Sequence, residues 1–190
     1  MSFLDALFGR SKPKQANLDA LFALPSAAVT LEAAGGFRPS GEAGVCFRPA
    51  AGEGFAAAEQ ELKGLLGLDA ASATQLEERD DSYGYHWVVL RAGGLEDLVG
   101  DVHTVNATLE GRGFGPQLLC SVFGFRPQGD GQAFLLVYLY KRGTFYPFAP
   151  AGKEQRDNEL ELRVRSLLEH ELPVESDLTR WFPLWGAPVA

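Results

Sequence analysis

The chain has 190 residues, of which 46% are hydrophobic and 22% are charged, so it can bury one sizeable core. Its formal net charge of -8 argues against general nucleic-acid binding, because phosphate contacts need clustered Lys and Arg. Its two cysteines, Cys46 and Cys120, are too few for a disulfide framework, and no run reaches the ~20 apolar residues of a spanning helix.

The first elements in chain order are two copies of Leu-Asp-Ala-Leu-Phe, at 4–8 and 18–22. The first copy is expected to form a short apolar helix that Gly9 ends, followed by a basic tract. Such a short helix needs a surface to lie on, which could be this domain, a protein partner or an anionic membrane. The expected docking residues are Phe3, Leu4, Leu7, Phe8, Arg10, Lys12 and Lys14.

Residues 1–16 are therefore expected to be an amphipathic arm with a basic linker, and residues 17–190 a single domain. Asn17 can cap the second copy as a short helix, which Pro25 is expected to stop. Apolar periodicity and turn residues then predict strands at 28–33, 44–48, 74–79 and 85–91 and a helix at 54–66.

The second half begins with the clearest helical pattern, over residues 95–112. Strands are expected at 117–125, 132–140 and 144–148, and Pro147 restricts the last of these to an edge or an end of the sheet. A final helix is expected at 153–169, stabilised in part by a Glu161/Arg165 pair, before a proline-rich tail.

Strand pairs separated by helices predict an α+β fold, with an antiparallel sheet of about five to seven strands and helices mainly on one face. The tripeptide Phe-Arg-Pro occurs at 37–39 and again at 125–127. Two related halves and a coincidence between turn-rich segments both remain open as explanations.

The residues that could carry chemistry form no recognisable catalytic or metal-binding motif. Asp97 and Asp101 have helical ligand spacing, but His103 faces elsewhere, and His86 is expected to be a structural or surface residue. We therefore expect no catalytic residues, no metal and no cofactor.

The aromatic and basic segment 138–148 is the other candidate for function. Aromatic side chains beside Arg and Lys often form recognition surfaces through stacking and cation–π contacts. The expected surface comprises Tyr138, Tyr140, Lys141, Arg142, Tyr146 and Arg156. The alternative is a hairpin whose aromatic side chains face the core.

Several strings of the chain resemble the PspA-associated protein family, PspAB type. They are Phe-Leu-Asp-Ala-Leu-Phe-Gly-Arg at 3–10, the segment 17–25, the segment 137–150, Arg-Asp-Asn-Glu-Leu at 156–160 and Arg-Trp-Phe-Pro at 180–183. The resemblance implies a PspA-like coiled-coil partner and a role in envelope stress. It implies no catalytic residues.

These observations together favour a non-enzymatic cytoplasmic adaptor of the phage-shock response that acts by protein–protein contact. Peripheral membrane contact through the arm and a homodimer are both compatible with the sequence. Two alternatives stay open: a small-molecule-binding or enzymatic domain that uses the Tyr138–Tyr146 surface, and a dimeric chaperone-like protein.

Overall fold

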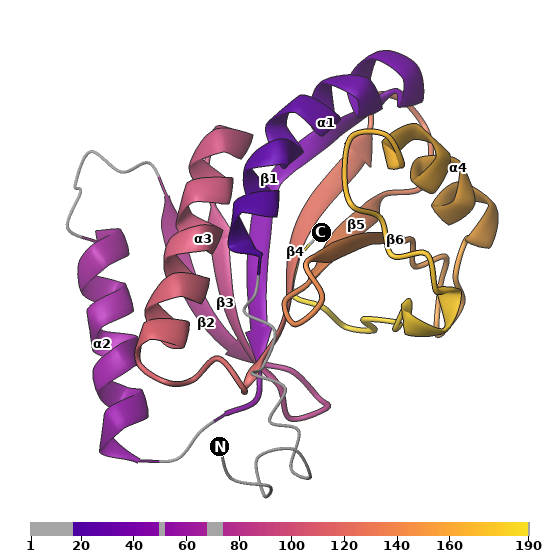
Figure 1. Cartoon of the computed structure of the whole chain (residues 1–190). Helices are drawn as coiled ribbons and strands as arrows, with labels where there is room; N and C mark the ends of the chain where they lie inside the picture. Colours follow the sequence, from indigo (N-terminus) through magenta and orange to yellow (C-terminus); the bar gives the residue numbers. More distant parts are fainter. Residues whose placement is uncertain (1–16, 50–51, 68–73, 190) are drawn as a thin grey trace, which may run out of the picture.

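The computed structural model describes residues 17–49, 52–67 and 74–189. Within these ranges the chain forms an α+β fold with six strands in one antiparallel sheet and four helices (Figure 1). The strands are β1 (Phe37–Phe47), β2 (Gln75–Asp80), β3 (His86–Arg91), β4 (Leu118–Pro127), β5 (Phe134–Leu139) and β6 (Thr144–Phe148). The α-helices are α1 (Leu24–Thr30), α2 (Glu53–Gly67), α3 (Leu95–Gly111) and α4 (Asn158–Leu168).

The sheet has the order β2-β3-β1-β4-β5-β6, with the long strand β1 at its centre. The two Phe-Arg-Pro copies lie opposite each other in the β1–β4 ladder, where Arg38 is the register partner of Arg126. The strands on either side of this pair are connected differently: β1 pairs with β3 rather than with β2, whereas β4, β5 and β6 form a meander. The repeated tripeptide thus marks a local pairing at the centre of the sheet.

The two faces of the sheet carry separate hydrophobic clusters because successive strand residues point to opposite sides. On β5, Phe134, Leu136 and Tyr138 belong to one cluster, and Leu135 and Val137 belong to the other. The buried apolar residues of all four helices lie in the first cluster, and the C-terminal tail (residues 173–189) contributes Trp181 and Val189 to the second. Figure 1 shows α2, α3, α1 and α4 following one another across the molecule.

The strand expected at 28–33 is wrong, because this stretch is helical. A 3₁₀ helix (Leu18–Ala23), α1 and a π-helical turn (Leu31–Gly35) follow one another as the N-terminal helical segment (residues 18–35). Pro25 lies in the first turn of α1, where its missing N–H costs nothing, so it begins a helix and does not stop one. Leu21, Leu24 and Leu31 are fully buried at helical spacing, and this spacing prevails over the weak alternation of residues 28–33.

Local side-chain chemistry explains the edge position of the last strand and the start of the last helix. The strand β6 is the sheet edge, as Pro147 predicts. The tail covers part of this edge, because Phe145 N–H donates to Pro173 O (2.9 Å) and Glu175 N–H donates to Phe145 O (2.7 Å). Helix α4 begins at Asn158, later than expected, because the Asp157 side chain caps it by accepting from Leu160 N–H.

Candidate functional site

The C-terminal tail is held against the sheet by aromatic contacts. Trp181 stacks on Tyr146 with ring centroids 5.9 Å apart, and Trp185 meets Phe148 edge-on at 5.0 Å. Near the end of the tail, Val189 packs so close to Gly44 that a Cβ there would lie 3.0 Å from a Val189 methyl. The tail therefore packs on the sheet face that carries the second hydrophobic cluster.

A buried carboxylate anchors the beginning of the tail. Glu175 is 2% exposed; it pairs with Arg142 and accepts from Thr144 Oγ1 (3.0 Å) and Asp177 N–H (3.1 Å). Burial alone would raise the pKa of Glu175, but the hydrogen bonds from Arg142, Asp177 N–H and Thr144 outweigh it and hold this pKa below its usual value. Glu175 is therefore a charged anchor that is satisfied inside the fold.

A second buried pair joins α4, β6 and the tail. Arg156 Nε lies 2.9 Å from Glu161 Oε1, and the same carboxylate oxygen accepts from Ala149 N–H at 2.8 Å. The Arg156 guanidinium also donates to Trp181 O and lies 5.2 Å from the Phe148 ring centroid. The sequence predicts that Glu161 pairs with Arg165 on the helix surface. In the structure Glu161 is only 2% exposed and pairs with Arg156 instead.

The structure does not bring the expected recognition surface together. Tyr138 and Tyr140 lie in the helix-side cluster and Tyr146 in the tail-side cluster, and all three are buried. Of the remaining members, Lys141 is exposed and donates to Pro116 O (3.0 Å), whereas Arg142 and Arg156 hold Glu175 and Glu161.

The hydroxyl groups of Tyr138 and Tyr146 donate hydrogen bonds inside the fold. Tyr138 donates to Asn17 O and Tyr146 donates to Phe182 O, both at 2.8 Å. Burial raises the pKa of Tyr138 to about 12 and also raises the pKa values of Tyr140 and Tyr146. These phenols stay protonated at neutral pH, and the hydroxyls of Tyr138 and Tyr146 hold Asn17, just before the N-terminal helical segment, and Phe182 in the tail.

A cavity of about 570 Å³ opens between the tail and the sheet. Its lining is mainly aromatic and apolar, and its charged members are Arg48 and Asp81. Burial would raise the pKa of Asp81, but the hydrogen bonds from Trp87 Nε1 and from the Tyr85 and Tyr83 N–H groups lower it. The aromatic and apolar lining includes Tyr83, Tyr85, Trp87, Leu119, Leu139, Tyr146, Phe182, Leu184 and Trp185.

The two cysteines line the same cavity. Cys46 and Cys120 are register partners in the β1–β4 ladder, and both are buried as free thiols. The hydrogen bond with Cys120 and burial together raise the pKa of Cys46, so this thiol is a poor nucleophile. The sequence contained no signal for this pairing, because the register of two distant strands brings the thiols together.

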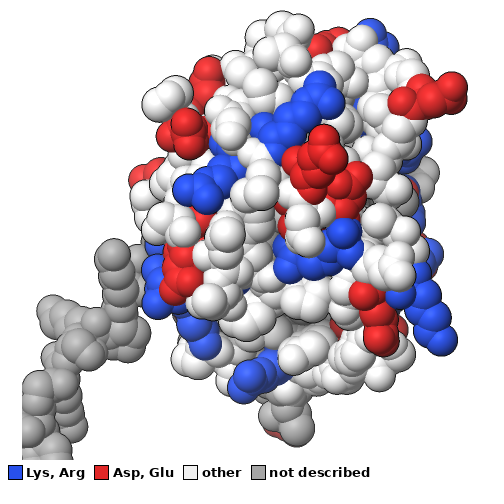
Figure 2. All heavy atoms as spheres, turned by 90° about the vertical axis from the view of Figure 1, so that its right-hand side faces the viewer, with Lys and Arg blue, Asp and Glu red and all other residues white. Residues whose placement is uncertain are grey.

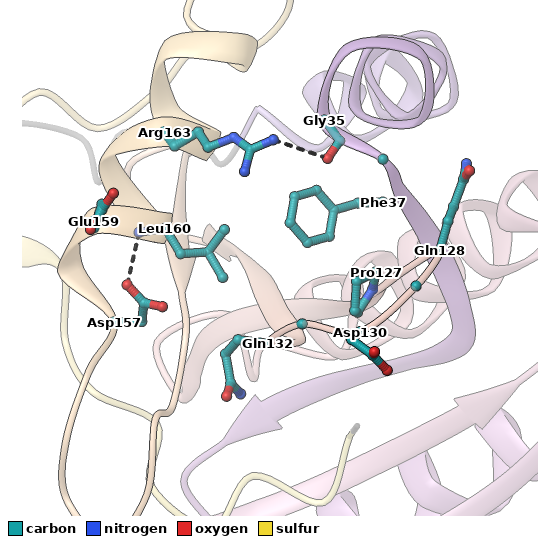
Figure 3. A pocket seen from close by; sticks show the side chains of 13 residues that line it. Gly35, Phe37, Pro127, Gln128, Asp130, Gln132, Asp157, Glu159, Leu160 and Arg163 are labelled. Carbon is teal, nitrogen blue, oxygen red and sulfur yellow. Dashed lines mark hydrogen bonds between the residues drawn. The ribbon is translucent and has the colours of Figure 1, made fainter.

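A second cleft, of about 520 Å³, lies between α4, the β4–β5 turn and the end of the N-terminal helical segment (Figure 3). Figure 3 shows Leu160 and Phe37 facing each other across it, with Arg163 above them. The Arg163 guanidinium donates to Gly35 O at 3.3 Å, and this contact links α4 to the end of the N-terminal helical segment. The carboxylates of Asp130, Asp157 and Glu159 also line the cleft, which gives it a polar, acidic rim.

The charges around α4 and the tail are mixed in sign. Figure 2 shows this side of the molecule with Lys and Arg interspersed among Asp and Glu. No extended region of one sign appears on the face drawn there, which is the distribution expected of an ordinary solvated surface.

The outer side of the N-terminal helical segment is apolar and exposed. Phe22 is 54% exposed and Val29 is 67% exposed, and we call these two side chains the apolar ridge. The Phe22 ring lies 5.1 Å from the His103 ring of α3, so the ridge continues onto α3. The described stretch Leu18–Gly35 is long and apolar enough to cross a membrane by length and composition, and 33% of it is buried.

The N-terminal arm itself lies outside the described residues. Its expected docking residues, Phe3, Leu4, Leu7, Phe8, Arg10, Lys12 and Lys14, therefore have no described placement. The second Leu-Asp-Ala-Leu-Phe copy belongs to the fold, because Leu18 and Leu21 are buried and only Phe22 is largely exposed among its apolar residues.

Comparison with known proteins identifies one family. No curated protein and no solved structure matches the chain. The family model for PspA associated protein B matches residues 1–189. The strings that anchor the tail and the strings at the start of the chain both fall within this match, and the chain belongs to the PspA associated protein B family, PspAB.

Proposed function

We propose that this protein is a non-enzymatic cytoplasmic accessory protein of the PspA system that acts by protein–protein contact. The family connects the chain with PspA, and the apolar ridge supplies a surface for such a contact. In this proposal the ridge binds helices of a PspA-like coiled-coil partner. The observation that carries the proposal is the exposure of Phe22 and Val29 on a helix whose other side forms the core.

The spacing of the ridge suits a helical partner. Phe22 and Val29 are seven residues apart, which places them two turns apart on the same side of the helical segment. An amphipathic helix recognises such a row through side chains at i, i+3, i+4 and i+7. Large apolar side chains that remain in water on a folded domain are the kind of group that partner binding would bury.

The same helix is also a core element. Leu21, Leu24, Ala27 and Leu31 are fully buried against the sheet, so crossing a membrane would require this side to leave the core. This requirement favours docking along the helix over membrane insertion. The proposal also assigns docking to the apolar and basic residues between Phe3 and Lys14, which precede this segment in the chain.

Several features support a role without catalysis. The tyrosines of segment 138–148 hold the fold together with protonated hydroxyl groups, and Arg142 and Arg156 balance buried carboxylates. Cys46 is a poor nucleophile because its pKa is raised. Two free thiols that face each other across a ladder also fit a reducing compartment such as the cytoplasm.

The test is a binding titration between the purified full chain and a purified PspA-like coiled-coil protein. The double variant Phe22→Ser/Val29→Ser should weaken binding at least about tenfold, because each lost anchor costs on the order of 1 kcal/mol or more. Deleting residues 1–15 should weaken it further. The matched control is Leu178→Ser, which changes a side chain of similar exposure (51%) on the tail.

The outcomes separate the possible occupants of the ridge. If the ridge variant binds PspA as tightly as the natural chain, the docking proposal fails. Light scattering that shows a dimer, converted to a monomer by Phe22→Ser/Val29→Ser, would instead assign the ridge to self-association. Co-sedimentation with anionic vesicles that depends on the arm alone would assign the arm to a membrane.

The cavity beneath the tail favours one second candidate, the binding of a small apolar ligand. Its volume of about 570 Å³ and its aromatic lining fit an acyl or aromatic molecule. Trp87 and Trp185 lie in its wall, so a bound ligand should change tryptophan fluorescence. A titration with fatty acids and aromatic acids that leaves both the fluorescence and the melting temperature unchanged would remove this candidate.

A further inference from the structure

Three potential metal ligands from three elements meet at the β2 edge of the sheet. Glu59 comes from α2, Glu78 from β2 and His86 from β3, and one ligand atom from each lies within 4.8 Å of the others. The β2–β3 register explains the meeting, because Asp80 lies directly opposite His86, and Glu78 is two residues from Asp80 on the same face. Helix α2 places Glu59 against that face.

The two nitrogens of His86 have different surroundings. Nδ1 lies 2.8 Å from Asp80 Oδ1, which assigns the ring hydrogen to Nδ1. Nε2 is inaccessible to solvent, has no hydrogen-bond partner and lies 3.9 Å from Glu59 Oε1. A buried lone pair that faces carboxylates is unfavourable unless a cation lies between them.

A carboxylate that orients one nitrogen of a histidine is also the usual support for a histidine that binds metal through the other nitrogen. We propose that Glu59, Glu78 and His86 bind a divalent transition-metal ion of the Zn²⁺ type, with Asp80 as the residue that positions His86. The nitrogen ligand favours such an ion over Ca²⁺ and Mg²⁺, which prefer oxygen ligands throughout. Two carboxylates neutralise the charge of the ion.

A lysine competes for the same site. Lys63, one turn along α2 from Glu59, places its Nζ 2.9 Å from Glu78 Oε2. Metal binding would displace this ammonium into solvent, where the largely exposed side chain can turn. Removing the lysine charge should therefore strengthen metal binding and distinguish a metal site from a set of ion pairs.

This site extends beyond the sequence-based expectation, which contained no metal ligands. Bound metal would tie α2 to the β2–β3 hairpin by direct coordination, independently of any PspA contact. The spacing of the ligands along the chain has no metal-binding signature, because the strand register and the packing of α2 bring them together.

The experiment titrates ZnCl₂ into the tag-free full chain and follows heat and melting temperature. At free Zn²⁺ near 100 times the dissociation constant, the melting temperature should rise by roughly 5–10 °C. His86→Gln, Glu59→Gln and Glu78→Gln should each remove most of this rise. Asp80→Asn should lower the affinity by about 10–100-fold, and Lys63→Met should raise it.

His170→Ala is the matched control, because this histidine side chain is 90% exposed outside the cluster. It should bind Zn²⁺ like the natural chain. The glutamate-to-glutamine variants preserve shape, so they keep the test valid if His86→Gln fails to fold. The Co²⁺ spectrum of the natural chain should lack thiolate-to-metal charge transfer, which excludes Cys46 and Cys120 as ligands.

Three results would overturn the proposal. One is a natural chain whose heat and melting temperature do not respond to Zn²⁺. Another is a response that persists in all three ligand variants. The third is a response lost only when Cys46 and Cys120 are replaced by serine, which would place the metal in the cavity beneath the tail.

Discussion

The two faces of the central sheet are covered in different ways. The helix-side face is packed with apolar side chains from α1, α2, α3 and α4. The tail-side face is covered by a chain segment with little regular structure, fixed by Glu175, the Arg156–Glu161 pair and aromatic stacking. Apolar packing dominates the first face, whereas the tail on the second face also depends on polar partners at defined positions.

Several segments that resemble the PspAB family contain residues that hold the tail against the sheet. The segments 137–150, 156–160 and 180–183 are among those that resemble the family, and their Tyr146, Arg156 and Trp181 all take part in holding the tail. Most backbone groups of the tail have no partner within a helix or a strand. Particular side chains therefore supply the contacts that hold the tail in place. The surface proposed for partner binding lies on the other side of the molecule, on the N-terminal helical segment.

The largest expected effect is on the tail-side face. Arg156→Ala should lower the free energy of unfolding by about 3–5 kcal/mol, because it leaves the buried Glu161 carboxylate without its partner. Urea unfolding measures the change. Lys153→Ala, at an exposed position nearby, should change it by less than about 0.5 kcal/mol. Equal effects of the two variants would show that the pair does not hold the tail.

On the helix-side face, the free energy of unfolding should depend mainly on the volume of the buried side chains. Leu24→Ala should cost about 2–5 kcal/mol, because it opens a cavity beneath the first helix. Val29→Ala, on the exposed side of the same helix, should cost less than about 1 kcal/mol. Thermal unfolding of both variants tests this contrast, and a reversed order would mean that the N-terminal helical segment packs by its other side.

Acid should weaken the tail-side face specifically. The folded pKa of Glu175 is lowered, so its contribution is present above the unfolded pKa of about 4.3 and is lost as pH falls through the folded value. Glu175→Gln should therefore be less stable than the natural chain at pH 7, and the difference should shrink below about pH 4. Unfolding measured between pH 7 and pH 3 tests the sign, and a gap that widens on acidification would contradict it.

The smallest expected effect concerns a single hydrogen bond. Tyr146→Phe removes the hydroxyl that donates to Phe182 O at 2.8 Å and should cost about 0.5–1.5 kcal/mol. Tyr83→Phe, at a 57% exposed tyrosine, serves as the control and should be close to neutral. A neutral Tyr146→Phe would show that stacking with Trp181 is sufficient at this position.

Most elements of the helix-side face could be predicted from the sequence, except the N-terminal helical segment, and the path of the tail on the other face could not. Regular apolar spacing predicts α2 and α3 and most strands, because burial of one side imposes a period on the residues. The expected strand at 28–33 failed because a stretch rich in alanine fits either period and only Leu21, Leu24 and Leu31 packing on the sheet decides between them. The α+β class and the edge position of β6 are confirmed.

The candidate sites depend on the pairing register of distant strands and on helix packing. Neither can be predicted from the composition or from the spacing of residues along the chain. Cys46 meets Cys120 only through the β1–β4 ladder, and Glu59 reaches His86 only through the packing of α2. The aromatic and basic string at 138–148 was interpreted as a surface, but alternation along β5 and β6 places Tyr138 and Tyr146 on opposite faces. Local sequence therefore does not determine which residues these side chains contact.

In our proposal the apolar ridge on the outer side of the N-terminal helical segment, and not the tail, contacts the PspA-like partner. Hydrogen–deuterium exchange of the full chain with and without that partner tests it most directly, because exchange reports on each segment separately. We predict slower exchange over residues 18–35 in the complex and unchanged exchange over residues 173–189. Protection confined to the tail, or no protection of residues 18–35 in a saturated complex, would contradict docking at the apolar ridge.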